Sequence, residues 1–321
     1  MNKLIAIALC MLALLPGAAS AQGAYPNRPV KIVVGFPPGS SADVTARILA
    51  RKLSDSLGQQ VLVENRPGAG SNIAAESVVR SPADGYTLLL GTVANTINAS
   101  MAKNLSFNFA TDLAPIALVT SVPNILVAHP SLNVSTVPEL IALAKSKPEQ
   151  IPYASSGNGT SPHLSGELFN LMAGVKLVHV PYKGSSQAVT DLLAGRTPVM
   201  FSPASTVLAH IQNGSLKALA VTSAKRAAFL PALPTVSESG LTGFDTSVWC
   251  GLLAPAGTPR EIIDKMAQAS TQALAAADVK SQLAAQGIDP LGGTPAELAR
   301  YISQETEKWS KLAQATGAKI E

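Results

Sequence analysis

The sequence contains little cysteine and few aromatic residues. Among 321 residues there are two cysteines, Cys10 and Cys250, and aromatic residues account for 4%. A small scaffold held by several disulfides is therefore excluded, and stability has to come from a large hydrophobic core. The shortage of aromatic rings argues against a groove that stacks sugars or the bases of single-stranded nucleic acid.

Concentrated charge is also missing. The chain carries 24 Lys and Arg residues against 20 Asp and Glu residues, and its basic clusters, as at 51–52 and 225–226, are no longer than two adjacent residues. Binding to a phosphate backbone needs a concentrated basic face, so we expect no nucleic acid partner. The mild positive balance suits small anions instead.

The N-terminal apolar run is too short to cross a membrane. It covers residues 4–15, whereas a spanning helix needs about 20 residues. Lys3 precedes this run and small residues ending at Ala21 follow it, which is the layout of a signal peptide. We therefore expect residues 1–21 to be a signal peptide cleaved after Ala21, and the mature chain to be periplasmic and not membrane-embedded. Cys250 is then its one remaining cysteine, so no intrachain disulfide is expected.

The common catalytic and cofactor-binding motifs are absent from the sequence. There is no Gly-x-Ser-x-Gly turn, no Gly-Lys-Ser/Thr phosphate loop and no Gly-x-Gly-x-x-Gly after a strand. The four histidines lack i, i+4 spacing and flanking carboxylates, so no metal site is expected at His129, His163, His179 or His210. Cys250 adjoins Trp249 and is expected to be a buried, unreactive thiol. These absences indicate a protein without a cofactor and without catalysis.

Apolar strand-like runs alternate with helical patterns in two series, which is typical of mainly parallel sheets flanked by helices. Between the series, short strands are expected at 116–119 and 125–128, separated by a loop at 121–124. Capping-box spacing at 136–139, 258–261 and 294–297 predicts three helix starts. We expect two α/β lobes joined by two crossover strands, with residues 22–122 and 249–321 in the first lobe and 123–248 in the second.

The stretch around residues 30–44 reads as a strand, a tight loop and the start of a helix. Val30–Val34 is a β-branched run, and a Pro-Pro-Gly loop ends it. Ser40 or Ser41 is suited to be the N-cap, and Asp43 falls in the first turn, where the helix dipole favours negative charge. Such a loop presents unpaired backbone N–H groups that bind a carboxylate or phosphate. An ordinary βα turn remains the alternative.

A similar Gly/Ser/Thr-rich opening occurs at 155–163, in the second series. If both openings face one cleft, an anion lies between two helix N-termini, with Ser156 and Thr160 as additional donors. Lys183 and the segment 92–95 end other strands and are candidates to complete the site. The alternative for Lys183 is a solvated loop lysine, and His179 is expected to be a packed core residue.

Five ordered motifs resemble one known family. They are residues 25–30 (YPNRPV), 36–43 (FPPG…D), 64–70 (ENRPGAG), 81–89 (SPADGYTLL) and 181–184 (PYKG). The chain resembles the substrate-binding proteins of tripartite tricarboxylate transporters, often called the Bug family, over essentially its whole mature length. The resemblance implies a type II periplasmic-binding-protein fold, a small organic carboxylate as ligand, membrane transporter subunits as partners, and a monomer.

The resemblance also implies which residues hold the ligand. In the family, the loops matching 36–43 and 156–160 hold the carboxylate, partly through ordered water, and those matching 91–95 and 202–204 help to line the pocket. The candidate ligand-binding residues are Phe36, Pro38, Gly39, Ser40, Ser41, Asp43, Thr92, Asn95, Ser156, Gly157, Gly159, Thr160, His163, Lys183, Ser202 and Ala204. The family usually has Gly-Gly where this chain has Ser40-Ser41, which tightens the backbone approach or adds side-chain donors.

Two other functions use the same residues. One is a periplasmic hydrolase of carboxylate esters, with Ser40 or Ser156 as nucleophile and His163 as base. The other is a sensor whose liganded form is read by a membrane signalling protein instead of a transporter. The sequence does not separate transport from sensing.

Overall fold

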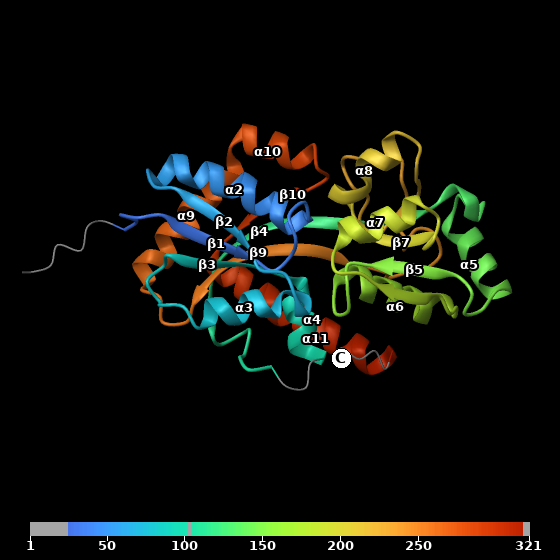
Figure 1. Ribbon diagram of the computed structural model, residues 1–321, viewed down its shortest axis with the longest axis horizontal. Coiled ribbons are helices and arrows are strands. Elements are labelled where there is room, and N and C mark those ends of the chain that lie inside the picture. Colours follow the sequence, from blue (N-terminus) through green and yellow to red (C-terminus); the bar gives the residue numbers. More distant parts are fainter. Residues whose placement is uncertain (1–24, 102–104, 317–321) are drawn as a thin grey trace, which may run out of the picture.

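The computed structural model describes residues 25–101 and 105–316. The chain forms two α/β lobes that lie side by side (Figure 1). In the described residues, ten strands make one mixed sheet whose main path has the order β2-β1-β3-β9-β4-β7-β5-β6. The two-lobed α/β architecture expected from the sequence is confirmed. The expected signal peptide and the cleavage site after Ala21 lie outside the described residues.

The first lobe is built on three parallel strands. These are β1 (Val30–Val34), β2 (Val61–Asn65) and β3 (Thr87–Thr92). Three helices cover one face of the sheet: α2 (Ser41–Leu57), α9 (Arg260–Ala275) and α10 (Ala277–Ala284) (Figure 1). Three others cover the opposite face: α3 (Asn72–Val79), α4 (Val93–Met101) and α11 (Pro295–Thr316) (Figure 1). The C-terminal helices thus return to the lobe in which the chain begins.

The second lobe repeats this plan on a smaller scale. Its parallel strands are β5 (Pro152–Ser155), β6 (Val178–Pro181) and β7 (Val199–Pro203). The helices around them are α5 (Val137–Ser146), α6 (Ser161–Ala173), α7 (Ser185–Leu193) and α8 (Ala204–Gln212). Short elements complete the chain: η2 (Ala69–Ser71), η3 (Pro130–Leu132), β8 (Lys217–Val221) and β10 (Asp289–Gly293).

Two long strands connect the lobes. β4 (Leu113–Ala128) and β9 (Ser247–Pro255) pair antiparallel and run from one lobe into the other (Figure 1). Every antiparallel pairing in the described sheet involves one of these two strands. On β4, Pro123 pairs with β9 and Asn124 pairs with β7, so the strand changes partners between these residues. The lobe boundaries at 122/123 and 248/249 stay a prediction.

Two expectations about local structure were wrong. The runs at 116–119 and 125–128 are parts of the single strand β4, because Pro123 lies where the pairing changes and its missing N–H does not interrupt the ladder. Thr258 does not cap α9, since its hydroxyl donates to the carbonyl of Pro255 and the helix begins after Pro259. The capping box at Thr294 is present: the Glu297 amide donates to Thr294 Oγ1 at 3.2 Å.

The hydrophobic core forms two clusters. The larger surrounds β1, β3, β4 and β9 and extends to α7 and α8 through Ala188 and Val207. The smaller packs α5 and α6 against the strands of the second lobe through residues such as Phe169 and Phe201. No helix in residues 25–101 or 105–316 is both long and apolar enough to span a membrane.

Candidate functional site

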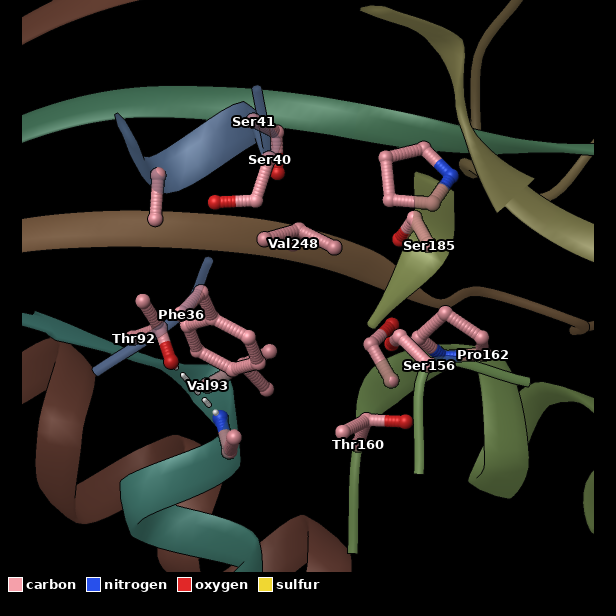
Figure 2. A pocket seen from close by; sticks show the side chains of 14 residues that line it. Phe36, Ser40, Ser41, Thr92, Val93, Ser156, Thr160, Pro162, Ser185 and Val248 are labelled. Carbon is pink, nitrogen blue, oxygen red and sulfur yellow. Dashed lines mark hydrogen bonds between the residues drawn. The ribbon is translucent and has the colours of Figure 1, made fainter. Parts of the chain in front are cut away.

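A small cavity of about 30 Å³ lies between the two lobes, beside the crossover strand β9. Figure 2 shows Phe36, Ser40, Ser41, Thr92 and Val93 on one side and Ser156, Thr160, Pro162 and Ser185 on the opposite side. The full lining is Phe36, Ser40, Ser41, Ala42, Thr92, Val93, Ala94, Ser156, Thr160, Ser161, Pro162, Ser185, Pro203 and Val248. This volume holds about two water molecules or one carboxylate group.

Five described helices begin at this cavity. Its lining includes the first residues of α2 (Ser41), α4 (Val93), α6 (Ser161) and α7 (Ser185), together with Pro203, which directly precedes α8. Each helix N-terminus carries roughly half a positive charge from aligned peptide dipoles. Convergence of several such ends in a partly buried space creates a positive potential without any cationic side chain. The lining is therefore suited to an anion.

Backbone donors at these helix ends are free. In the described chain, the amides of Ser41, Ala42, Ser161 and Ser185 have no hydrogen-bond acceptor. First-turn amides of a helix have no partner inside the helix and need a cap, water or ligand. Thr160 precedes α6 but does not cap it, because its hydroxyl donates to the carbonyl of Gly157 at 2.7 Å. The α6 amides thus stay open to the cavity.

Some of the lining hydroxyls already have a hydrogen-bond partner and some do not. Ser40 Oγ accepts from the Asp43 amide, Thr92 Oγ1 accepts from the Ala94 amide (Figure 2), and both therefore cap their own helices. The hydroxyls of Ser41, Ser156 and Ser185 have no partner among the described residues. These three side chains can turn toward a bound molecule, since a hydroxyl both donates and accepts.

No lining residue in the described chain is charged, and the nearby Asp43 does not face the cavity. Its carboxylate accepts hydrogen bonds from the amide of Gly39 (3.0 Å), Asn65 Nδ2 (2.8 Å) and Arg47 Nε (3.0 Å). Burial alone would raise the pKa of Asp43, but these donors, above all Arg47, hold it below its usual value. The ionised carboxylate of Asp43 therefore holds the loop at 36–40 in place through its hydrogen bond with the Gly39 amide.

A stack of rings supports the loop at 155–160. His179 on β6 lies between Tyr153 and His163, with ring centroids 5.0 Å and 4.0 Å away. His179 Nε2 is 2.7 Å from Ser155 Oγ, and the Gly159 amide donates to His163 Nδ1 at 3.2 Å. Burial lowers the pKa of His163 to about 4. His179 is half-buried in this stack rather than a core residue as expected.

The structure brings six of the sixteen expected ligand-binding residues into the cavity wall: Phe36, Ser40, Ser41, Thr92, Ser156 and Thr160. The others do not line it. Gly39, Asp43, Asn95, Gly157, Gly159 and His163 lie just behind it, in the loops or helix turns that carry the lining. Pro38 and Lys183 are exposed, while Ser202 and Ala204 are fully buried.

Eight lining residues were not among the sixteen named candidates. Six of them lie in segments expected at the site (36–43, 91–95, 155–163 and 202–204), whereas Ser185 and Val248 lie outside these segments; the eight are Ala42, Val93, Ala94, Ser161, Pro162, Ser185, Pro203 and Val248. All except Val248 lie within two residues of a helix start. The spacing of strand, loop and helix could have identified Ser161 and Ser185, since each opens a helix after a parallel strand. Val248 belongs to a crossover strand, and no local pattern marks it.

The hydrogen bonds that the alternative hydrolase would need are not present in this geometry. In the described residues, neither Ser40 nor Ser156 makes a hydrogen bond with His163, whose Nδ1 accepts from a backbone amide. Cys250 is fully buried on β9, and burial raises the pKa of its thiol to about 12, as expected for an unreactive cysteine. The described part of the chain holds no group of three or more His, Cys, Asp or Glu side chains arranged to bind a metal ion.

Comparison with known proteins gives consistent matches. Residues 45–318 match the family model described as the tripartite tricarboxylate transporter family receptor. Protein BugT of Bordetella pertussis is 39% identical over 323 residues, which cover 100% of this chain and 99% of BugT.

Two solved structures extend these matches to the fold. Rpa4515 of R. palustris, solved with adipate, has a TM-score of 0.88 and 36% identity, covering 91% of this chain and 98% of that one. MatC of Rhodopseudomonas palustris, solved with bound malate, has a TM-score of 0.84 and 29% identity, covering 90% of this chain and 99% of that one.

Proposed function

The chain belongs to the tripartite tricarboxylate transporter receptor family, and on that premise we propose how its cleft works. It is a solute-binding protein for small organic carboxylates, and the solute binds in the cavity between the lobes. The family resemblance drawn from the five sequence motifs is confirmed.

The observation that carries this proposal is the convergence of helix N-termini on an uncharged cavity. The open amides of Ser41, Ala42 and Ser161 and the free hydroxyl of Ser185 supply donors from both lobes. A carboxylate held by several backbone amides is strongly stabilised in its charged form. The two relatives solved with adipate and malate are in line with a carboxylate ligand.

Transport is the proposed outcome of binding. Family membership implies a membrane transporter that receives the ligand from this protein. Export to the periplasm, with cleavage after Ala21, is supported by the charged and apolar pattern of residues 1–21. The protein is proposed to act without catalysis, since the histidine nearest to the cavity, His163, already accepts a backbone hydrogen bond.

Thermal unfolding with paired ligands tests the proposal. Malate, adipate, citrate and butanoate are each compared with the corresponding neutral amide. We expect at least one carboxylate to raise the melting temperature, because a ligand at 100 times its Kd adds about 2.7 kcal/mol to the free energy of unfolding. The matching amide should give no shift, since it lacks the charge that the helix ends stabilise.

Three results would count against the proposal. A panel in which no carboxylate shifts the melting curve removes the carboxylate assignment. Equal shifts for an acid and its amide mean that the cavity recognises shape and not charge. Turnover of carboxylate esters that disappears in the His163→Ala variant would establish the hydrolase instead.

A further inference from the structure

Two loops from opposite lobes touch at the edge of the cavity. One is the loop at 36–40, between β1 and α2, and the other is the turn at 182–185, between β6 and α7. Each loop supplies the cavity wall, through Phe36 and Ser185 respectively. The spacing between these loops therefore sets the width of the cavity.

Gly184 of one loop lies against Pro37 of the other. A Cβ atom placed on Gly184 would lie 3.0 Å from Pro37 Cγ and 3.4 Å from Pro37 Cδ. A Cβ atom on Gly39 would lie 3.8 Å from Ser186 Oγ on α7, an ordinary van der Waals distance. A Cβ atom at position 184 would therefore require Pro37 to move by a few tenths of an ångström, and a larger side chain would require more.

Pro37 makes this contact rigid. Its ring is fixed to the backbone, and Pro38 follows directly, so the ring cannot move aside as a long flexible side chain would. The cavity behind the contact has a volume of only about 30 Å³. Both lobes contribute to the wall of this cavity, so the distance between the lobes determines how much of a ligand fits inside it (Figure 2).

We propose that Gly184 and Pro37 form a spacer that sets how far the two lobes close, and that it thereby selects carboxylates by length. This inference rests on the proposed function, because it concerns the ligand of the same cavity. Gly184 is a positioning residue in this scheme: it acts through the distance between Phe36 and Ser185 and does not itself contact the ligand.

Backbone strain is a competing explanation for any effect at this position. Gly184 has φ of +152°, which L-residues rarely adopt. A substitution here would therefore combine strain with contact against Pro37. The two effects are separable, because shortening Pro37 removes the contact and leaves the strain.

The test uses the full mature chain with Gly184→Ala, Gly184→Val, Pro37→Ala and the two double variants. Gly240→Ala and Gly240→Val are the controls, because Gly240 has φ of +112° and a Cβ atom added to it would meet nothing within 4 Å. Calorimetry gives Kd for two straight-chain series, acetate to octanoate and malonate to suberate. The readout is the chain length that binds most tightly.

We expect Gly184→Val to weaken the shortest ligands at least tenfold and to move the optimum at least one methylene longer, with a smaller shift for Gly184→Ala. Pro37→Ala alone should move the optimum toward shorter ligands and tests the spacer even if the valine variant fails to fold. The double variants should return the optimum toward wild type, and the Gly240 variants should leave it unchanged.

An unchanged optimum in both Gly184→Ala and Pro37→Ala would overturn the spacer while leaving the proposed function intact. A shift that persists in the double variants would assign the effect to backbone strain and would also overturn it. Failure of the wild-type protein to bind any member of either series would overturn the spacer as a selector of length, whereas the proposed carboxylate function would fall only if malate and citrate also left the melting curve unchanged.

Discussion

The imidazole rings of His163 and His179 stack with their centroids 4.0 Å apart and their planes inclined by 19°. Tyr153 covers the other face of His179, and its hydroxyl donates to Glu167 Oε1 at 2.7 Å. Burial lowers the pKa of His163 to about 4; burial and the adjacent His163 lower that of His179 to about 3. Both rings are therefore neutral in the folded protein at pH values where an unfolded chain begins to protonate them.

The stack predicts a loss of stability in mild acid. As the pH falls from about 6.5 toward 4, the unfolded chain takes up protons that the folded chain refuses, so the free energy of unfolding falls by up to about 1.4 kcal/mol per pH unit for each histidine. Above pH 7 both histidines are neutral in the folded and in the unfolded chain, so proton binding no longer lowers the free energy of unfolding. Urea unfolding between pH 7.5 and 4.5 measures the slope.

The control for this prediction is substitution of one ring at a time. His179→Phe keeps a stacked ring but cannot be protonated, so it should flatten the pH dependence. His210→Gln changes a histidine outside the stack, at the end of α8, and should leave the slope as it is. A steep slope that survives in His179→Phe unchanged would assign the acid sensitivity to other groups.

The sequence predicted contacts between residues that are close along the chain and did not predict contacts between residues that are far apart along it. Ser40 or Ser41 was expected as the N-cap of α2, and Ser40 is the cap, because its Oγ accepts from an amide only three residues away. Asp43 was expected among the ligand-binding residues, which stays a prediction, and its carboxylate accepts from Asn65, which lies 22 residues further along the chain. Local spacing shows that Asp43 lies in the first turn of a helix. It does not show that Asn65, on a neighbouring strand, will donate a hydrogen bond to it.

The crossover strands illustrate the same limit. The sequence placed two crossings between the lobes, but the pattern around Pro123 read as a loop because a proline usually ends a strand. Only the pairing of β4 with β9 on one side and β7 on the other makes the strand continuous. Val248 lines the cavity for the same reason, as part of a strand whose partners are more than 100 residues away.

Removing the Asp43 carboxylate should weaken binding evenly across ligands. Asp43→Ala leaves the Gly39 amide without its acceptor and removes one of the two acceptors of Asn65 Nδ2, which also donates to the Phe36 carbonyl at 2.9 Å. This loss destabilises the fold by about 2–3 kcal/mol and loosens the loop at 36–40. All carboxylates should then bind more weakly by a similar factor, of about tenfold. Calorimetry on several carboxylates measures both the loss and its evenness.

Asp55→Ala is the matched control, since Asp55 is exposed on the same helix. It should change neither stability nor affinity beyond about 0.5 kcal/mol. A reordered ligand preference in Asp43→Ala would show that the carboxylate contacts the ligand or its bound water, contrary to the geometry described here.

Ser71 is expected to be a site where substitution stabilises the protein. Its φ is +77°, its side chain is fully buried, and its Oγ has no hydrogen-bond partner in the described residues. Ser71→Gly relieves the left-handed backbone and removes the unpaired hydroxyl, which should add about 1 kcal/mol and raise the melting temperature by a few degrees.

Asn133→Gly provides the comparison for Ser71. Asn133 also has a positive φ, of +55°, but it is exposed, and asparagine tolerates this conformation well. It should gain clearly less than Ser71→Gly. A lower melting temperature in Ser71→Gly would mean that the hydroxyl makes a stabilising contact, such as one with a buried water molecule.

The electrostatic basis of binding is tested most directly at Ser41. This residue opens α2, lines the cavity, and presents both a free amide and a free hydroxyl. Ser41→Asp adds a negative charge that the helix dipole favours, so the fold should keep its stability. The same charge would stand about 4 Å from a bound carboxylate, where repulsion in a partly buried site is about 4 kcal/mol.

We therefore expect Ser41→Asp to lose at least 100-fold in affinity for any carboxylate that stabilises the wild-type protein. Ser41→Asn has nearly the same shape without the charge and should lose far less, since its amide can still donate to the ligand. Calorimetry gives the affinities, and the melting temperature without ligand shows that both variants are folded. Equal affinities for the two variants would place the charged end of the ligand away from α2, because a charge in the first turn cannot stand beside a carboxylate without repelling it.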